Sequence, residues 1–112
     1  MKTPETHRFL VKSSRPPVVE IDSVAHAVYV RFKKGKVART VDCDATAMHV
    51  AVDLDASGHV IGVEGIGMNQ FNIEFLLKRA RVEAPAAAVA RTRYVPAMMS
   101  AREYSPEPVG AN

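Results

Sequence analysis

The sequence lacks the features that would place it directly among membrane-spanning or disulfide-stabilised proteins. It has one cysteine in 112 residues, Cys43, and no tryptophan. A single cysteine allows no disulfide within the chain, which is typical of proteins in a reducing compartment. The first 17 residues contain an apolar run of only three residues, from Phe9 to Val11, whereas a membrane span needs about 20. We therefore expect a cytoplasmic protein with no membrane partner.

Familiar catalytic and metal-binding motifs are also missing from the sequence. There is no Gly-x-Ser-x-Gly, no Cys-x-x-Cys and no His-x-x-x-His, which are spacings that carry nucleophilic catalysis or zinc binding. The Gly65-Ile66-Gly67 run lacks the third glycine of a dinucleotide-binding turn. We therefore predict no cofactor, no metal and no catalytic residues. A metal-dependent enzyme built around Asp42, Cys43 and His49 is the weakest alternative.

One segment matches a calcium-binding template. From Asp53 to Glu64, acidic residues stand at positions 1 and 3, a serine at 5, a glycine at 6 and a glutamate at 12. Such loops are normally flanked by helices, but here both flanks alternate like strands. In that case Glu64 lies roughly 20 Å from the turn, at about 3.3 Å per residue. We interpret the segment as an acidic turn that joins two strands.

The apolar residues of the first two thirds of the chain alternate with polar ones, which predicts strands. The clearest example places Met48, Val50, Val52 and Leu54 on one face. Five such strands are expected, at residues 18–22, 27–32, 37–43, 47–54 and 59–64. Because the intervening segments are short, consecutive antiparallel pairing is favoured. The sequence therefore predicts a five-stranded antiparallel β-meander.

After Gly67 the apolar period changes from two residues to that of a helix. Ile73, Leu76, Leu77 and Ala80 recur at helical spacing, and two phenylalanines, Phe71 and Phe75, widen the apolar stripe. Asn69 or Asn72 can cap the N-terminus of this helix. One helix over residues 70–81, packed on one face of the sheet, gives an α+β fold.

The remaining segments are predicted to be tails. Residues 1–17 form a flexible or loosely docked arm, residues 18–82 form the domain, and residues 83–112 form a mostly irregular extension interrupted by prolines. Three apolar residues of the extension are candidate partner-binding residues: Tyr94, Met98 and Met99.

Basic residues gather around the expected hairpin between the second and third strands, whose tip is residues 33–36. These candidate nucleic-acid-binding residues are Arg31, Lys33, Lys34, Lys36 and Arg39. A basic hairpin beside Tyr29 can hold a phosphate backbone. However, residues 18–82 contain eight basic and eight acidic residues, and the excess positive charge lies in residues 1–17. A basic folded domain is therefore not predicted.

Several short runs together resemble a known family. They read E-I-D at 20–22, A-V-Y-V-R-F at 27–32, V-D-L-D at 52–55 and G-H-V-I-G-V-E at 58–64. In this order they resemble the prokaryotic family called domain of unknown function number 2283, over about residues 18–81. The resemblance implies a small β-rich domain of bacteria, archaea and phages with no established enzymatic activity or cofactor. Some members are thought to lie beside toxin-like small proteins, which implies a protein partner.

Taken together, these observations predict a small non-catalytic binding module that acts through protein–protein contacts or self-association. Edge strands and apolar tails are typical of such a module. The alternative prediction is a nucleic-acid-associated regulator that uses the basic segment at 31–39.

Overall fold

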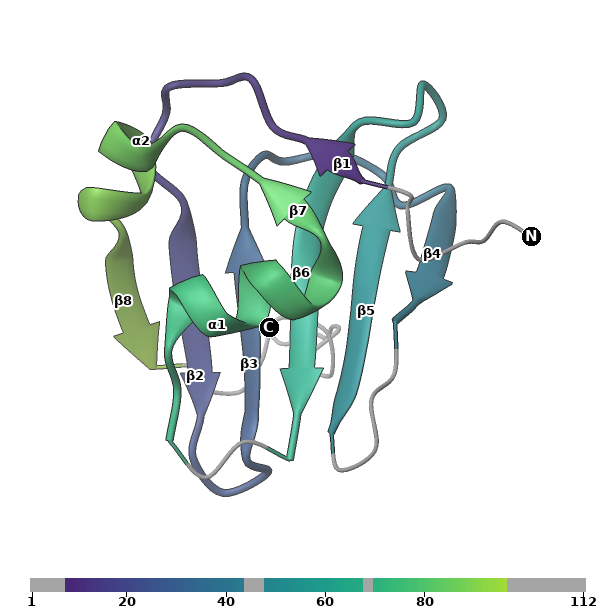
Figure 1. Ribbon diagram of the computed structural model, residues 1–112. Coiled ribbons are helices and arrows are strands. Elements are labelled where there is room, and N and C mark those ends of the chain that lie inside the picture. The colour runs from purple at the N-terminus through teal and green to yellow at the C-terminus, as the bar shows by residue number, and fades with distance from the viewer. Residues whose placement is uncertain (1–7, 44–47, 68–69, 97–112) are drawn as a thin grey trace, which may run out of the picture.

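A computed structural model describes residues 8–43, 48–67 and 70–96 and shows an α+β fold, mostly sheet with two helices (Figure 1). The strands are β1 (Phe9–Leu10), β2 (Val18–Asp22), β3 (Ala27–Arg31), β4 (Arg39–Asp42), β5 (His49–Leu54), β6 (Val60–Ile66), β7 (Val82–Glu83) and β8 (Arg93–Pro96). The helices are α1 (Ile73–Ala80) and α2 (Ala86–Ala90). No helix in the described ranges is long and apolar enough to cross a membrane.

The main sheet has six strands in the order β4-β5-β6-β3-β2-β8, and a separate parallel pair joins β1 to β7. All neighbours in the main sheet are antiparallel except β2 and β8, which are parallel. The five expected strands are present, but the predicted five-stranded meander is wrong. Strand β6 lies between β3 and β5, so β3 and β4 are not neighbours, and β8 adds a sixth strand. The four strands from β3 to β6 thus form a Greek key, in which the segment between β3 and β4 is the long connection.

Burial explains why β6 takes the central place and β4 the edge. All residues of β6 from Val60 to Val63 are buried, whereas three of the four β4 residues are exposed. The segment between β3 and β4 is consequently a crossover over the end of β6, not a hairpin tip. Phe32 N donates to Ile61 O at 2.8 Å, and Ala38 N donates to Leu54 O at 2.8 Å. This crossover covers Ile61, which is fully buried.

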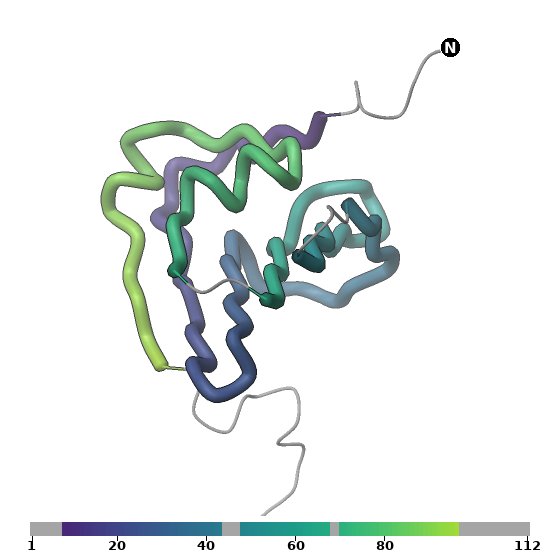
Figure 2. The backbone as a smooth tube through the Cα atoms, turned by 60° about the horizontal axis from the view of Figure 1, so that its bottom comes forward, coloured from purple at the N-terminus to yellow at the C-terminus, as the bar shows by residue number. Residues whose placement is uncertain are grey.

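Helix α1 confirms the helical periodicity of the sequence, although it is shorter than the expected range. Its N-cap is Asn72, whose Oδ1 accepts a hydrogen bond from Phe75 N at 3.0 Å. Its buried side chains are Ile73, Leu76, Leu77 and Ala80. The prediction that Phe75 belongs to the buried stripe is wrong, because that side chain is 47% exposed. Figure 2 shows α1 on the same side of the sheet as the β1 and β7 segments.

Part of each expected tail is integrated into the domain. In the segment 8–17, β1 pairs with β7, and Pro17 is fully buried. Arg93 N donates to Pro17 O at 3.1 Å, so β8 is attached to the end of the same segment. The segment 83–96 contains α2 and β8. Residues 1–7 and 97–112, which include Met98 and Met99, lie outside the described residues.

Candidate functional site

The two faces of the main sheet differ in chemistry. On the face toward α1, valines and leucines of β2, β3, β5 and β6 form one apolar core with the helix. The opposite face, which we call the polar face, carries Glu20, Tyr29, Arg31, Asp53 and Glu64, all at positions that alternate with core residues.

Asp53 is the centre of a hydrogen-bonded group on the polar face. Its Oδ2 accepts a hydrogen bond from Tyr29 Oη at 2.8 Å, and its Oδ1 accepts one from Thr40 Oγ1 at 2.7 Å. The Tyr29 ring crosses β6 to reach Asp53, which is possible because Gly62 has no side chain. A Cβ at Gly62 would lie 2.4–2.5 Å from the ring and hydroxyl atoms of Tyr29. One contact therefore explains why tyrosine, glycine and aspartate occur together in the runs quoted above.

Several charged side chains on the polar face are paired with one another. Arg31 forms an ion pair with Glu20 at 3.4 Å, and its guanidinium lies 5.0 Å from the centre of the Tyr29 ring. His49 Nε2 lies 3.6 Å from Glu64 Oε1. These contacts, and the hydroxyl donors that Asp53 binds, engage the polar side chains of the face with one another. Among the described residues, the side-chain contacts of the polar face are made within the sheet.

The residues of the metal-enzyme alternative are not brought together. Asp42 and Cys43 are neighbours in sequence and lie on opposite faces of the sheet, and His49 contacts Glu64. Cys43 Sγ faces the α1 side, 3.7 Å from Val41 O and 4.0 Å from Ala80 O. Among the described residues, no three histidine, cysteine, aspartate or glutamate side chains are close enough to hold a metal ion.

The predicted nucleic-acid-binding residues are divided between two faces. Arg31 lies on the polar face in β3, whereas Arg39 lines a groove on the α1 side in β4. Because β6 and β5 separate these strands, the distance between them is three interstrand spacings, about 14 Å. Lys33 forms an ion pair with Asp55 at 2.7 Å. Lys34 and Lys36 are exposed on the crossover. The expected basic hairpin is not formed.

The acidic turn between β5 and β6 is organised by Asp55. Its Oδ1 accepts hydrogen bonds from Ser57 N and His59 N, both at 2.9 Å, and its Oδ2 binds Lys33. These donors, the Lys33 ammonium first among them, lower the pKa of Asp55 from 3.8 to about 2. The interpretation of this segment as a turn between strands is confirmed, because β5 and β6 flank it directly.

The lowered pKa of Asp55 predicts how stability depends on pH. Because its carboxylate is favoured in the folded state, its contribution is present above about pH 4 and is lost as the pH falls through about 2. We expect Asp55→Asn to lower the melting temperature at pH 7, since asparagine keeps the hydrogen-bond acceptor and loses the charge. The difference from wild type should narrow between pH 4 and pH 2 in thermal melts followed by circular dichroism. A difference that is constant down to pH 2 would contradict this assignment.

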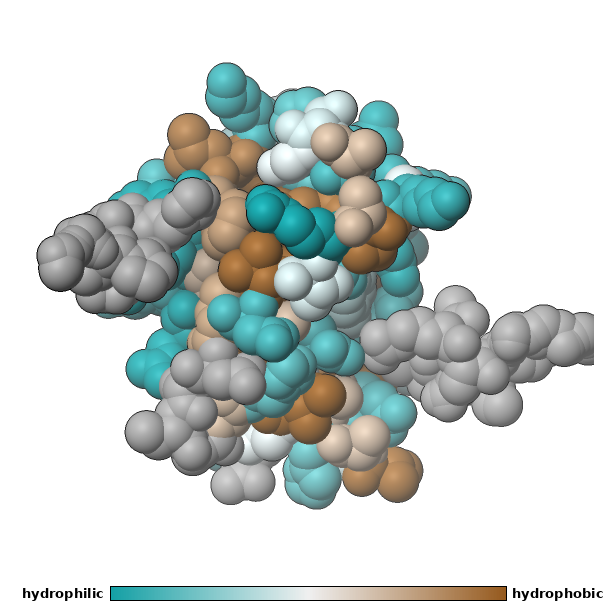
Figure 3. Space-filling model, turned by 90° about the vertical axis from the view of Figure 1, so that its right-hand side faces the viewer, coloured by the Kyte–Doolittle hydropathy of each residue, from teal (hydrophilic) through white to brown (hydrophobic). Residues whose placement is uncertain are grey.

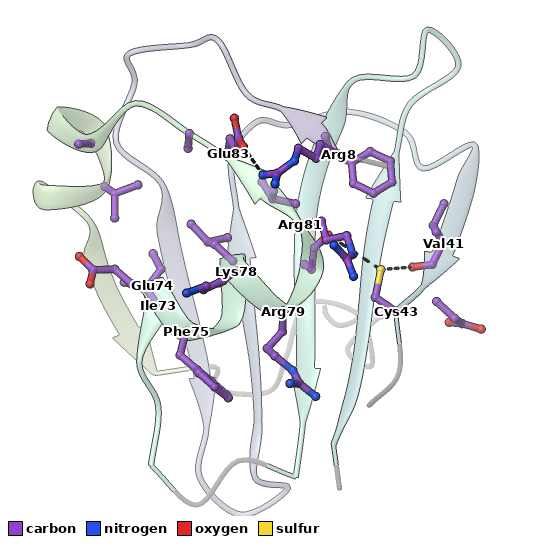
Figure 4. Close-up of a pocket in the computed structure, with 18 of the residues that line it drawn as sticks. Arg8, Val41, Cys43, Ile73, Glu74, Phe75, Lys78, Arg79, Arg81 and Glu83 are labelled. Atoms are coloured by element: carbon purple, nitrogen blue, oxygen red, sulfur yellow. Dashed lines mark hydrogen bonds and ion pairs between the residues drawn. The ribbon is translucent and has the colours of Figure 1, made fainter. Parts of the chain in front are cut away.

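A broad groove runs along α1, from β4 on one side of the helix to α2 and Tyr94 of β8 on the other (Figure 4). Its volume is about 1630 Å³, compared with about 300–1,000 Å³ for a typical small-molecule pocket. Residues from α1, the β1–β7 pair, β4, α2 and β8 line it, and the apolar part of its β4 side includes Val41, Leu77 and Val82. Seen from the β4 edge, brown apolar patches lie between teal hydrophilic side chains (Figure 3). Its size suits a polypeptide segment better than a small molecule.

The groove is lined by more cations than anions. Five basic residues, Arg8, Arg39, Lys78, Arg79 and Arg81, line it with Glu74 and Glu83, and Asp42 also borders it, although its register in β4 places its side chain on the polar face. Arg8 and Glu83 form an ion pair with each other. The other four basic side chains are exposed, and Arg79 lies 5.8 Å from the centre of the exposed Phe75 ring. The groove therefore has a positive potential toward solvent.

Strand β4 adds unpaired backbone groups to this groove. Among the residues that the structure describes, β4 is the last strand of the sheet, and only one of its edges is occupied, by β5. Cys43 N donates to Val50 O at 2.7 Å, so the backbone N–H of Cys43 points at β5. Val41, two residues earlier and paired with Val52, points its backbone groups at β5 in the same way. Because hydrogen bonds along a strand point alternately to its two sides, the N–H and C=O groups of Thr40 and Asp42 point away from the sheet. An extended chain can bind to them.

The opposite edge of the sheet is less suited to an added strand. Strand β8 ends at Pro96, which has no N–H to donate. Tyr94, a predicted partner-binding residue, is 53% exposed there, and its ring packs edge-on against Phe71 with 6.1 Å between ring centres. We therefore take the groove and the β4 edge as the candidate site.

Sequence reasoning did not identify the groove. Sequence patterns gave the basic residues near the end of α1 no binding role, and they placed Arg39 with the lysines of the expected hairpin. The available signal was the spacing of Arg39, Val41 and Cys43, which stand at every second position and therefore lie on the same face of the strand. That signal places a cation on the side of the sheet that the helix covers.

Comparison with known proteins identifies no relative: no family model, curated protein or solved structure matches this chain. The resemblance given by the short sequence runs therefore stays a prediction.

Proposed function

We propose that this chain is a binding module that takes up an extended polypeptide segment by strand addition at β4. The observation that carries the proposal is the combination of an open strand edge with an adjoining groove. In strand addition, backbone hydrogen bonds supply affinity, and pockets for alternate side chains supply specificity. Thr40 and Asp42 provide the backbone groups, and the groove provides the pocket.

The dimensions of the site limit the size of the bound segment. Strand β4 has four residues, so the paired part of a partner is about 13 Å long at about 3.3 Å per residue. Side chains on one face of the added strand enter the groove, and those on the other face extend the polar face next to Thr40 and Asp42. Such a short ladder favours weak and reversible binding.

Backbone amide exchange measured by NMR tests the proposal directly. The probes are ten-residue peptides of alternating threonine and glutamine or alternating threonine and glutamate. We expect either peptide to slow hydrogen exchange at the Thr40 amide, which points away from the sheet. The Val41 amide, which points at β5, serves as an internal reference because its protection does not depend on the peptide. If neither peptide at millimolar concentration slows exchange at Thr40, the proposal is wrong.

A pair of substitutions at one position provides the matched control. Asp42→Pro removes an outward N–H without removing a bond to β5, a position that edge strands tolerate. Asp42→Ala removes the same carboxylate and keeps the N–H. We expect the peptides to protect the Thr40 amide in Asp42→Ala and not in Asp42→Pro. Equal protection in the two variants would mean that binding does not use the strand edge.

A further inference from the structure

The charges around β4 are distributed unequally between its two sides. On the groove side, Arg39 of β4 lines the groove together with Arg79 and Arg81 of the α1 end, whereas Lys78 points away from β4, to the Glu74 side of the helix (Figure 4). On the polar face, by contrast, β4 presents the hydroxyl of Thr40 and the carboxylate of Asp42. In a strand bound along β4, every second side chain would therefore lie next to the groove cations. The side chains between them would lie next to the Thr40 hydroxyl and the Asp42 carboxylate.

The end of α1 holds one of these cations in an unfavourable backbone conformation. Arg81 is left-handed, with φ 60° and ψ 39°, at the position after the helix where glycine is usual. Its N–H closes the helix by donating to Lys78 O at 3.1 Å. Glycine would make the same bond without a Cβ penalty. The arginine therefore adds a cation at the groove where the backbone alone favours glycine.

A second copy of the chain is a poor occupant of the groove. Antiparallel pairing of two β4 strands would place the two cationic grooves on the same face of one continuous sheet. The exposed Arg39, Arg79 and Arg81 side chains of each copy would then lie beside those of the other, at a cost of like-charge repulsion. A partner with carboxylates at those positions gains the corresponding attraction instead.

We infer that the segment bound at β4 is acidic at alternate positions, with its carboxylates facing the groove cations. This inference rests on the proposed strand addition and names the chemistry of its partner. Alternation is required because side chains of a strand point to opposite faces at every second residue. Carboxylates on the other face would meet Asp42 and are therefore disfavoured.

Three peptides of equal length test this inference by fluorescence anisotropy. In the first peptide threonine alternates with glutamate, and in the second threonine alternates with glutamine. The third has the composition of the first, but two threonines are followed by two glutamates throughout. We expect the alternating glutamate peptide to bind about tenfold more tightly than the glutamine peptide at low salt, and the advantage to shrink as salt screens the pairs. It should also bind more tightly than the paired peptide, which has the same composition and net charge but divides its carboxylates between the two faces.

Substitutions in the groove test whether the preference for glutamate depends on the groove cations or only on the total charge of the protein. Arg79→Gln combined with Arg81→Gly should abolish the preference for glutamate over glutamine. Lys34→Gln combined with Lys36→Gln, which removes the same charge from the crossover, should keep that preference. Because glycine suits the backbone at position 81, Arg81→Gly alone should not lower the melting temperature, so weaker binding by that variant cannot be attributed to unfolding.

The outcomes distinguish this inference from the proposed function. If glutamate and glutamine peptides bind equally and both protect the Thr40 amide, the acidic preference is wrong and strand addition stands. If no peptide protects that amide, both are wrong. If single-stranded dT12 binds more tightly than the alternating glutamate peptide and groove variants weaken it, the groove binds nucleic acid and the inference is overturned. Concentration-dependent dimers that Asp42→Pro abolishes would identify a second copy as the occupant.

Discussion

Replacing Leu76 by alanine should lower the free energy of unfolding by about 2–5 kcal/mol, the range measured when a large aliphatic side chain is removed from a protein core. Leu76 is fully buried in the middle of α1, and it packs between the helix and the central strands. The helix is the main element that covers the apolar face of the sheet, so a cavity there weakens the contact between the two layers. Because domains of this size are stable by only about 5–15 kcal/mol, the loss is a large part of the total.

Phe75→Ala is the matched control, because Phe75 is the adjacent residue of the same helix and is 47% exposed. Its replacement also removes a large apolar side chain but leaves no buried cavity, so we expect a change of about 1 kcal/mol or less. Urea unfolding followed by circular dichroism measures both variants. Equal losses in the two variants would contradict the assignment of Leu76 to the core and Phe75 to the surface.

Replacing Gly62 by alanine should destabilise the protein by about 1–3 kcal/mol, although alanine is only one methyl group larger. The added Cβ would lie 2.4–2.5 Å from three atoms of Tyr29, which is much closer than van der Waals contact. Tyr29 would have to move, and its hydroxyl would then lose the hydrogen bond to Asp53. The carboxylate would keep only Thr40 as a described side-chain donor.

A double-mutant cycle assigns this loss to the contact with Tyr29. Tyr29→Val removes the ring, so the Gly62→Ala substitution should cost less in that background than in wild type. The two effects are measured by urea unfolding at pH 7. If Gly62→Ala costs the same with and without the ring, the loss comes from the strand backbone and not from the close approach of Tyr29.

Local sequence patterns determined strands β2 to β6 and helix α1, and the faces that these elements bury. The alternation in β5 and the helical spacing of Ile73, Leu76 and Leu77 correctly placed these residues in the core. Both patterns depend only on how side chains project from a strand or a helix. The cap at Asn72 and the acidic turn at Asp55 were likewise predictable, because each is a contact between residues close in sequence.

Only the tertiary structure decided which strands are neighbours and therefore where the candidate site lies. Alternation is the same in a meander and in a Greek key, so it could not show that β6 separates β3 from β5. That order follows from burial. Strand β6, whose residues from Val60 to Val63 are buried and which has no side chain at Gly62, lies in the centre of the sheet, and the more exposed strand β4 lies at the edge. The groove forms only when this edge lies beside the end of α1, about 40 residues later in the chain. A site whose parts are distant in sequence leaves no local pattern, because the contacts that create it arise from packing.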